Sequence, residues 1–360
     1  MRSQADDTNG AVNACADAAL GALRRTTRLV ERAPVLAQPP TAALPEAGGD
    51  DARLQAAYRF CAPDASAPQD VLASPIASTS SRLAQVPLGL AVQETTAVDW
   101  TGPPATTGWG PLGQTAGQGL HVQSPLAFPP ARLPLGLLAP SVWARDPDAM
   151  GQRTRRQPWP MGQQESQQWL TSLEAVCRAP AWGPQTRLVR LGEREAEVSD
   201  LRAPARPEGV EVLLRASWDR GVPAPERAVW ATVAAQAVVE RRRVQGPRHG
   251  PHPGRDATLG RRFCPLTRRP PQPRHSEGLP AVAWWAVQVR AVEPPDGGEP
   301  LAWRLVTTVA VQTGDDAIER VAWYAGRWGL AVGQRMVQRG WRSAARQLAT
   351  GERLPRCLPR

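Results

Sequence analysis

Two apolar segments in the middle of the chain each end beside a glutamate. LGLAVQ (88–93) runs directly into Glu94, and RLVRL (187–191) is followed by Gly192 and Glu193. Short aliphatic runs of this kind predict β-strands. They belong to a longer series of strand-like segments. One expected helix lies within this series, and another follows its last strand. This order predicts an α/β fold, with a mixed core and an inserted β region.

The other expected elements follow from the same periodicity. Before residue 86 the pattern is helical, with amphipathic segments at 14–33 and 51–62 and a proline- and glycine-rich connector at 34–49. Residues 219–280 are rich in arginine and proline and show no clear pattern. Strands are expected at 82–100, 117–128, 131–144, 185–194, 209–218, 281–292 and 301–311, and further helices at 163–179 and from Asp315 to Trp341.

The chain is strongly basic. Its formal net charge is +10, and all 43 basic residues are arginines. This excess indicates a polyanionic partner, with nucleic acid first, because the arginine fork matches phosphate oxygens and guanine edges. A GC-rich genome that replaced lysine with arginine would explain the choice of arginine but not the net charge.

The cysteines and the first residues of the chain indicate the cellular compartment in which the protein is expected. The cysteines are odd in number and widely spaced, without any CxxC pair, so we expect neither a disulfide framework nor a zinc ribbon. MRSQADDTNG (1–10) lacks the apolar segment of a signal peptide, and no apolar run reaches the about 18 residues of a membrane span. We therefore expect a soluble, cytoplasmic protein.

Several common sites are disfavoured. The glycine-rich segment 106–119 lacks the Gly-Lys-Ser/Thr ending of a phosphate-binding loop, so a plain loop is expected there. His249 and His252 have a spacing that could hold a metal, but a solvated basic loop fits their arginine- and proline-rich surroundings better. No histidine accompanies a GxSxG serine, which disfavours a hydrolase triad.

Glu94 and Glu193 form the first candidate site, because each carboxylate follows an expected strand. Carboxylates at neighbouring strand ends are the arrangement by which α/β nucleases hold two magnesium ions for phosphoryl transfer. The alternative is a pair of ordinary surface glutamates.

The expected closing helix carries the second candidate site. At 100° per residue, its cationic and aromatic groups gather within about 60° of Tyr324. Such a face suits a phosphate backbone and unpaired bases, whereas the alternative is a core helix whose arginines extend into solvent. That sector contains Arg327, Trp328, Ala331, Arg335 and Gln338. The opposite sector, expected to pack closely on a sheet, contains Ala325, Gly329, Gly333, Met336 and Val337.

Six ordered segments resemble the DDE transposases of insertion sequences, in the insertion-sequence-four and Tn-five-like group. The similarity extends from about residue 20 to the end of the chain. The segments are LAVQETTAVDWTG (90–102), ATTGWGPLG (105–113), LPLGLLAPSVWARD (133–146), QQESQQWL (163–170), LVRLGEREAEVSDL (188–201) and YAGRWG (324–329).

The resemblance implies a fold, a reaction and partners. Residues 1–85 would form a helical DNA-binding domain, 86–218 the first part of a ribonuclease-H-like core, 219–312 a β-rich insertion and 313–360 the closing catalytic helix. The implied chemistry is two-metal phosphoryl transfer with Mg²⁺ or Mn²⁺, in which water cuts at a transposon end and the freed 3′-hydroxyl attacks target DNA. Double-stranded DNA with terminal inverted repeats and a second copy of the chain are the implied partners.

The same resemblance assigns roles to particular residues. Glu94 and Glu193 match the first two metal-binding carboxylates, and Trp303 matches a tryptophan on which a flipped base stacks. A signature of tyrosine, arginine, glutamate and lysine with spacing Y-x2-R-x3-E-x6-K falls on Tyr324, Arg327, Ala331 and Gln338. Trp328 and Arg335 are expected to line the same groove.

The departures from this pattern bear on catalysis. Both matching acids are glutamates, one methylene longer than the family's aspartates, and the third acid is replaced by Ala331. Glu319 lies about 18 Å earlier along the helix and cannot substitute for it. The dimerisation helices expected after the closing helix are truncated at Arg360.

Three interpretations therefore remain. The first is a transposase that still cuts and joins DNA. The second, favoured here, is a relative with impaired or lost catalysis that binds DNA, either as a remnant or as an inhibitor of an active transposase. The third is an unrelated arginine-rich nucleic-acid-binding protein.

Overall fold

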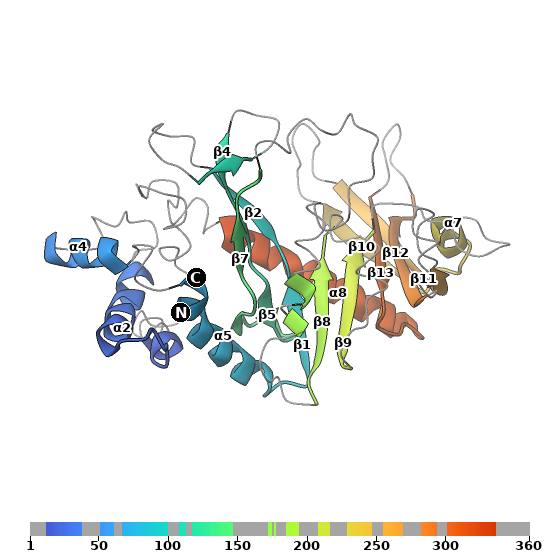
Figure 1. Cartoon of the computed structure of the whole chain (residues 1–360). Helices are drawn as coiled ribbons and strands as arrows, with labels where there is room; N and C mark the ends of the chain where they lie inside the picture. Colours follow the sequence, from blue (N-terminus) through green and yellow to red (C-terminus); the bar gives the residue numbers. More distant parts are fainter. Residues whose placement is uncertain are drawn as a thin grey trace, which may run out of the picture.

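The computed structural model describes a mixed α/β fold with a large mixed sheet and few helices (Figure 1). The described residues are 12–37, 51–60, 67–99, 108–112, 117–146, 172–174, 176–177, 185–193, 208–216, 229–246, 255–268, 282–293 and 301–335.

The helices of the described residues include α2 (Leu23–Ala37), α4 (Asp51–Phe60), α5 (Pro68–Leu83), α7 (Val229–Ala234) and α8 (Gly314–Arg335). The strands are β1 (Leu88–Val92), β2 (Thr95–Asp99), β3 (Gly110–Pro111), β4 (Gln118–Gln123), β5 (Leu126–Phe128), β6 (Gly136–Leu137), β7 (Ser141–Trp143), β8 (Arg187–Gly192), β9 (Val210–Arg215), β10 (Glu240–Gly246), β11 (Arg255–Arg268), β12 (Val282–Ala291) and β13 (Ala302–Thr307).

Nine strands form the large sheet, in the order β10-β11-β12-β13-β9-β8-β1-β5-β6. Strands β1, β8 and β9 pair in parallel at its centre, and the other pairs are antiparallel. A second sheet has the order β2-β4-β3, with β7 also paired to β4. Glu94 and Glu193 come after β1 and β8, two of these central parallel strands.

Alternate residues of the central strands build hydrophobic cores on opposite faces of the large sheet. Leu213, Val287 and Leu305 pack with Val321 and Tyr324 of α8. Their neighbours face the other way: Leu214, Ala286 and Val306 pack with α7 through Val229, Trp230 and Val233. We call these the α8 face and the α7 face.

Helix α5 covers the part of the sheet formed by β1, β5 and β8. Leu83, fully buried at the end of α5, packs with Ala91, Ala127 and Leu188. Gly89 makes this possible, because a Cβ at that position would overlap the Leu83 side chain. The missing side chain allows α5 to lie directly on β1.

Several expected strands are divided in the structure. Residues 82–100, expected as one strand, contain the end of α5 and then β1 and β2, which belong to different sheets. Likewise 117–128 is divided into β4 and β5, and 131–144 into β6 and β7. Apolar alternation predicts extended chain but carries no signal for the point at which the chain changes sheet. Pro125 marks one such point, since it has no N–H to donate to a ladder.

The segment with no clear sequence pattern contains α7, β10 and β11. Arginines, a glycine and a proline interrupt the apolar alternation of β11, RDATLGRRFCPLTR. Strand propensity therefore was a weak guide here, and pairing with β12 over ten residues defines the strand instead.

The described residues before 86 are mainly helical, as expected. Leu20, Leu29 and Phe60 are buried in one cluster with Leu120 of β4. The hydroxyl of Thr26 donates to the Ala18 carbonyl at 2.7 Å, which fixes the start of α2. The proline-rich connector was predicted to begin at Pro34, but α2 continues to Ala37.

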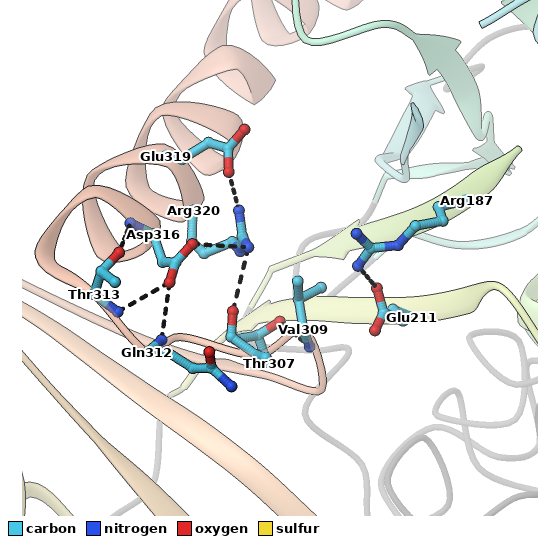
Figure 2. A network of polar contacts seen from close by, with 10 residues as sticks. Arg187, Glu211, Thr307, Val309, Gln312, Thr313, Asp316, Glu319 and Arg320 are labelled. Carbon is cyan, nitrogen blue, oxygen red and sulfur yellow. Dashed lines mark hydrogen bonds and ion pairs between the residues drawn. The ribbon is translucent and has the colours of Figure 1, made fainter. Parts of the chain in front are cut away.

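Helix α8 is fixed at its first turn by a reciprocal pair of hydrogen bonds (Figure 2). The Asp316 backbone N–H donates to the Thr313 hydroxyl at 3.1 Å, and an Asp316 carboxylate oxygen accepts from the backbone N–H groups of Gln312 and Thr313, each at 2.9 Å. This is a capping box. The same hydrogen bonds lower the pKa of the Asp316 carboxyl. The buried Arg320, next along the helix, pairs with Glu319 and lies 4.2 Å from the Trp323 ring centre.

Candidate functional site

The sheet places Glu94 and Glu193 side by side. Strands β1 and β8 are parallel neighbours with Val92 opposite Leu191, and the backbone N–H of Gln93 donates to the Leu191 carbonyl at 3.1 Å. Two residues further along the same register, Glu94 lies opposite Glu193 at the carboxyl edge of both strands. By alternation both side chains fall on the α8 face.

The position of Glu94 follows from the change of sheet. It lies between the end of β1 in the large sheet and the start of β2 in the small one. Its carbonyl accepts a 3.1 Å hydrogen bond from the backbone N–H of Ser124, which lies at the corresponding junction of β4 and β5. Two chain crossings therefore fix the backbone beneath this carboxylate.

Helix α8 brings Tyr324 and Arg327 onto the two carboxylates. The Arg327 guanidinium donates to both, through Nη1 to Glu94 Oε2 and through Nη2 to Glu193 Oε1. The Tyr324 hydroxyl donates to the same Glu193 oxygen at 2.7 Å. Arg327 is almost completely buried, whereas the glutamate side chains retain 26% and 22% of their exposure. The cation thus lies inside, beneath two partly solvated anions.

Arg215 completes the charge arrangement. Its Nη1 lies 3.7 Å from Glu193 Oε2, at the end of β9, which is the next parallel strand. The site therefore contains two carboxylates and two guanidinium groups. Sequence reasoning missed Arg215, although it lies in the expected strand 209–218. Its position on the same face as Leu213 was the available signal.

Trp303 and Tyr324 lie together in the core. Their rings meet edge to face, with centroids 6.3 Å apart and planes at 66°. The Arg327 guanidinium carbon is 5.7 Å from the Tyr324 ring centre. Trp303 is partly buried against the cluster under α8. Of the aromatic residues that the resemblance assigned to DNA contacts, Tyr324 therefore contacts Glu193 directly, and Trp303 packs on Tyr324.

The orientation of α8 differs from the expected one. Ala325 was expected on the side that packs on the sheet but is half-buried, whereas Tyr324 and Arg327, from the other sector, are buried against the sheet. The physical reason is charge, because this sector of the helix carries Arg327, which pairs with Glu94 and Glu193.

The remaining predicted site residues are placed only in part. Ala331 lies on α8 one turn after Arg327, about 6 Å further along the helix axis. Trp328 and Arg335 also belong to α8, and their side chains lie outside the description. Gln338, His249 and His252 lie outside the described residues.

The geometry tests whether these residues could hold the metals that the resemblance implies. Glu94 and Glu193 each direct a carboxylate oxygen at the Arg327 guanidinium. Among the residues that the structure describes, no three His, Cys, Asp or Glu side chains form a group that could hold a metal ion. Magnesium in such sites is held by carboxylate oxygens free to coordinate it. In this structure Glu94 and Glu193, the two described carboxylates of the expected set, are both paired with Arg327.

The environment of Tyr324 predicts a pH effect. Burial, and then the Glu193 carboxylate, raise the pKa of the Tyr324 hydroxyl well above its usual value, while Arg327 and Arg215 oppose the shift. The folded state thus favours the neutral hydroxyl. The stability that the neutral Tyr324 hydroxyl contributes to the folded state is complete below pH about 10. This contribution is lost as the pH rises through the folded-state pKa of Tyr324.

The chain has only two tyrosines, Tyr58 and Tyr324, so the effect is measurable. In an absorbance titration of tyrosinate, a step above the ordinary tyrosine range should be present in the native protein and absent in Tyr324→Phe. A late step that persists in Tyr324→Phe would contradict the assignment.

Comparison with known proteins identifies the N-terminal region. Residues 9–65 match the family model described as transposase DNA-binding. The match covers α2, α4 and the segment that packs against them. No curated protein shows a significant match to the chain. The chain therefore carries a transposase DNA-binding region, which supports a transposase-like role in binding DNA. No helix among the described residues is long and apolar enough to span a membrane.

Proposed function

We propose that this chain is a transposase-type DNA-binding protein, of the DDE group of insertion-sequence transposases, in which two-metal strand cleavage is impaired or lost. The second part is supported above all by Ala331, which stands where the family has its third acid, and also by the pairing of Glu94 and Glu193 with Arg327. The match of residues 9–65 supports the first part.

A ribonuclease-H-like core is part of the proposal. It is supported by the three parallel strands at the centre of the large sheet and by the carboxylates that follow β1 and β8. The β-rich insertion would correspond to β10 to β13, and the closing catalytic helix to α8. The DNA bound would be the terminal inverted repeats of a mobile element, with a homodimer as the assembly and the nucleoid as the location of the bound protein.

The proposed DNA contact of the first domain is α2. Arg24 is exposed and Arg28 is partly exposed on this helix, one turn apart, so both can point to the same phosphate backbone. Leu29, the next residue, faces inward and is buried at 8% exposure. The helix thus has a basic outer side and an apolar inner side.

A chain that binds transposon ends without cutting them would compete with an active transposase for the same ends. The loss of the third expected acid at Ala331 supports this version of the proposal.

The test combines binding and cutting in one sample. The full chain should bind duplex DNA of its element's ends in fluorescence anisotropy and leave it unnicked with Mg²⁺ or Mn²⁺. Arg24→Ala with Arg28→Ala should weaken binding about 10- to 100-fold near 0.1 M salt and reduce the salt slope by about 2, since each lost phosphate contact contributes about 0.9.

Arg82→Ala is the matched control, because Arg82 is exposed on α5, outside the matched region, and donates to the Leu135 carbonyl. It should leave DNA affinity unchanged. Equal loss in the control would remove α2 from the interface. Nicking by the unaltered chain that disappears in Glu193→Gln would overturn the proposed loss of cleavage.

A further inference from the structure

Five arginines lie on one face of four adjacent strands. The register pairs Arg241 with Gly260 and Gly260 with Arg290, and it pairs Arg262 with Gln288 and Gln288 with Arg304. Residues in register share a face of the sheet, and so do residues two apart in a strand. Arg243, two residues after Arg241, therefore belongs to the same group. We call Arg241, Arg243, Arg262, Arg290 and Arg304 the arginine face.

Neighbouring members of this group are close. Arg241 and Arg243 are two residues apart on β10, which is about 7 Å along a strand. Arg241 is the diagonal neighbour of Arg262, Arg262 of Arg290, and Arg290 of Arg304. Diagonal neighbours lie about 7–8 Å apart. The five cations form a continuous zigzag from β10 to β13.

The charges on this face are largely uncompensated. Arg241, Arg243, Arg290 and Arg304 are exposed and Arg262 is half-exposed. In the described parts of β10 to β13, Asp256 is the one acidic residue on this face, and it pairs with Arg243 at 2.8 Å. Adjacent like charges on a sheet repel each other. An anion with regularly spaced charges would remove this repulsion.

Two arginines of this face, Arg304 and Arg262, are held in position by contacts with α7 and the residues just after it. The Arg304 guanidinium carbon lies 5.4 Å from the ring centre of Trp230 on α7. Arg262 Nε donates to the Gln236 carbonyl, just after α7, at 3.1 Å. Helix α7 thus borders the arginine face and orients its inner edge, so that less side-chain entropy is lost when these arginines bind a ligand.

The arginine face is on the opposite side of the sheet from Glu94 and Glu193. Trp284 and Ala286, which share the face of Arg290, belong to the cluster under α7. Val287, Val289 and Trp303, which alternate with them, pack in the cluster under α8 with Tyr324. A straight duplex lying at the two glutamates cannot also lie on the arginine face.

The chemistry favours a duplex backbone. Single strands are bound by positively charged grooves that also offer aromatic side chains for stacking. On this face the described aromatic residues are Trp284, which is fully buried, and Trp230, which is covered by Arg304. What the surface presents is therefore a flat set of guanidinium groups, the contact that a phosphate backbone requires.

We infer that the arginine face binds the phosphate backbone of a second DNA duplex, separate from the DNA bound by the N-terminal domain. The inference rests on the proposed function for the identity of the polyanion. The protein would then hold two duplexes at once, one at the transposase DNA-binding region and one on the α7 face.

The experiment measures bridging by the full chain. A biotinylated duplex is immobilised with bound protein, and capture of a second, fluorescent duplex is recorded at increasing salt. Arg241→Gln, Arg243→Gln and Arg290→Gln are combined in one variant; Arg304 is left intact because it packs on Trp230. Capture should fall at least 10-fold and its salt slope by about 2 to 3, while binding to the first duplex remains.

The control combines Arg242→Gln with Arg187→Gln. Arg242 is exposed between Arg241 and Arg243 but points to the other side of the sheet, and Arg187 of β8 also lies on the α8 face. The control should capture the second duplex normally, and all variants should have the same circular dichroism and melting temperature.

The possible outcomes separate the two proposals. Full capture by the triple variant, equal loss in the control, or binding of one duplex without any bridging would each overturn the inference and leave the proposed function intact. Failure of the unaltered chain to bind any duplex would overturn both.

Discussion

Arg327→Met should lower the free energy of unfolding by about 3 kcal/mol. Arg327 is buried, and its guanidinium is shared by Glu94 and Glu193. Removing it leaves two carboxylates side by side without their common cation. Breaking a buried pair costs about 3–5 kcal/mol, and the lower end applies because both glutamates keep contact with water. Urea unfolding followed by far-ultraviolet circular dichroism measures the loss.

Two further variants test the cause. Arg187→Met is the matched control, because Arg187 pairs with Glu211 at 2.6 Å while half-exposed, and it should cost less than about 1 kcal/mol (Figure 2). Adding Glu94→Gln and Glu193→Gln to Arg327→Met should restore much of the lost stability. If the triple variant is no more stable than Arg327→Met alone, the loss comes from packing and not from unpaired charge.

Trp284→Ala should cost about 3–5 kcal/mol, as truncation of a large buried aromatic residue does. Trp284 is fully buried on β12, in the cluster that joins the sheet to α7. The cavity left by the Trp284 side chain would lie beneath α7, the helix that borders the arginine face. Urea unfolding measures the loss, and capture of a second duplex should fall with it near the unfolding midpoint.

Trp284→Phe is the informative comparison. The indole nitrogen of Trp284 has no hydrogen-bond partner among the described residues. Phenylalanine would remove this unsatisfied donor while keeping most of the apolar surface, so its cost should be well below that of alanine. Equal costs for the two variants would show that an interaction of the indole N–H matters.

The sequence was informative about the strands that follow simple alternation. LGLAVQ and RLVRL became β1 and β8, and their pairing placed Glu94 beside Glu193, because parallel neighbours end at the same edge. The strand that carries Trp303 and the closing helix were likewise expected. The contacts of Arg327 could not be predicted, because whether an arginine faces solvent or a carboxylate depends on how α8 is rotated on the sheet.

The arginine face shows a different limit. RRR (241–243) and RR (261–262) are visible as basic runs, but a run does not tell which members share a side. Only the cross-strand register separates Arg241 and Arg243 from Arg242 and relates them to Arg290 and Arg304. Register depends on long-range pairing, which local pattern does not specify.

The bridge formed by Arg327 also changes what the two acidic residues mean. In a site that holds metal ions, carboxylates at strand ends are maintained because the reaction needs them. Here Glu94 and Glu193 also help to hold α8 on the sheet, so selection for a folded chain would be sufficient to maintain them without any cutting. The two acidic residues alone therefore do not identify a working nuclease.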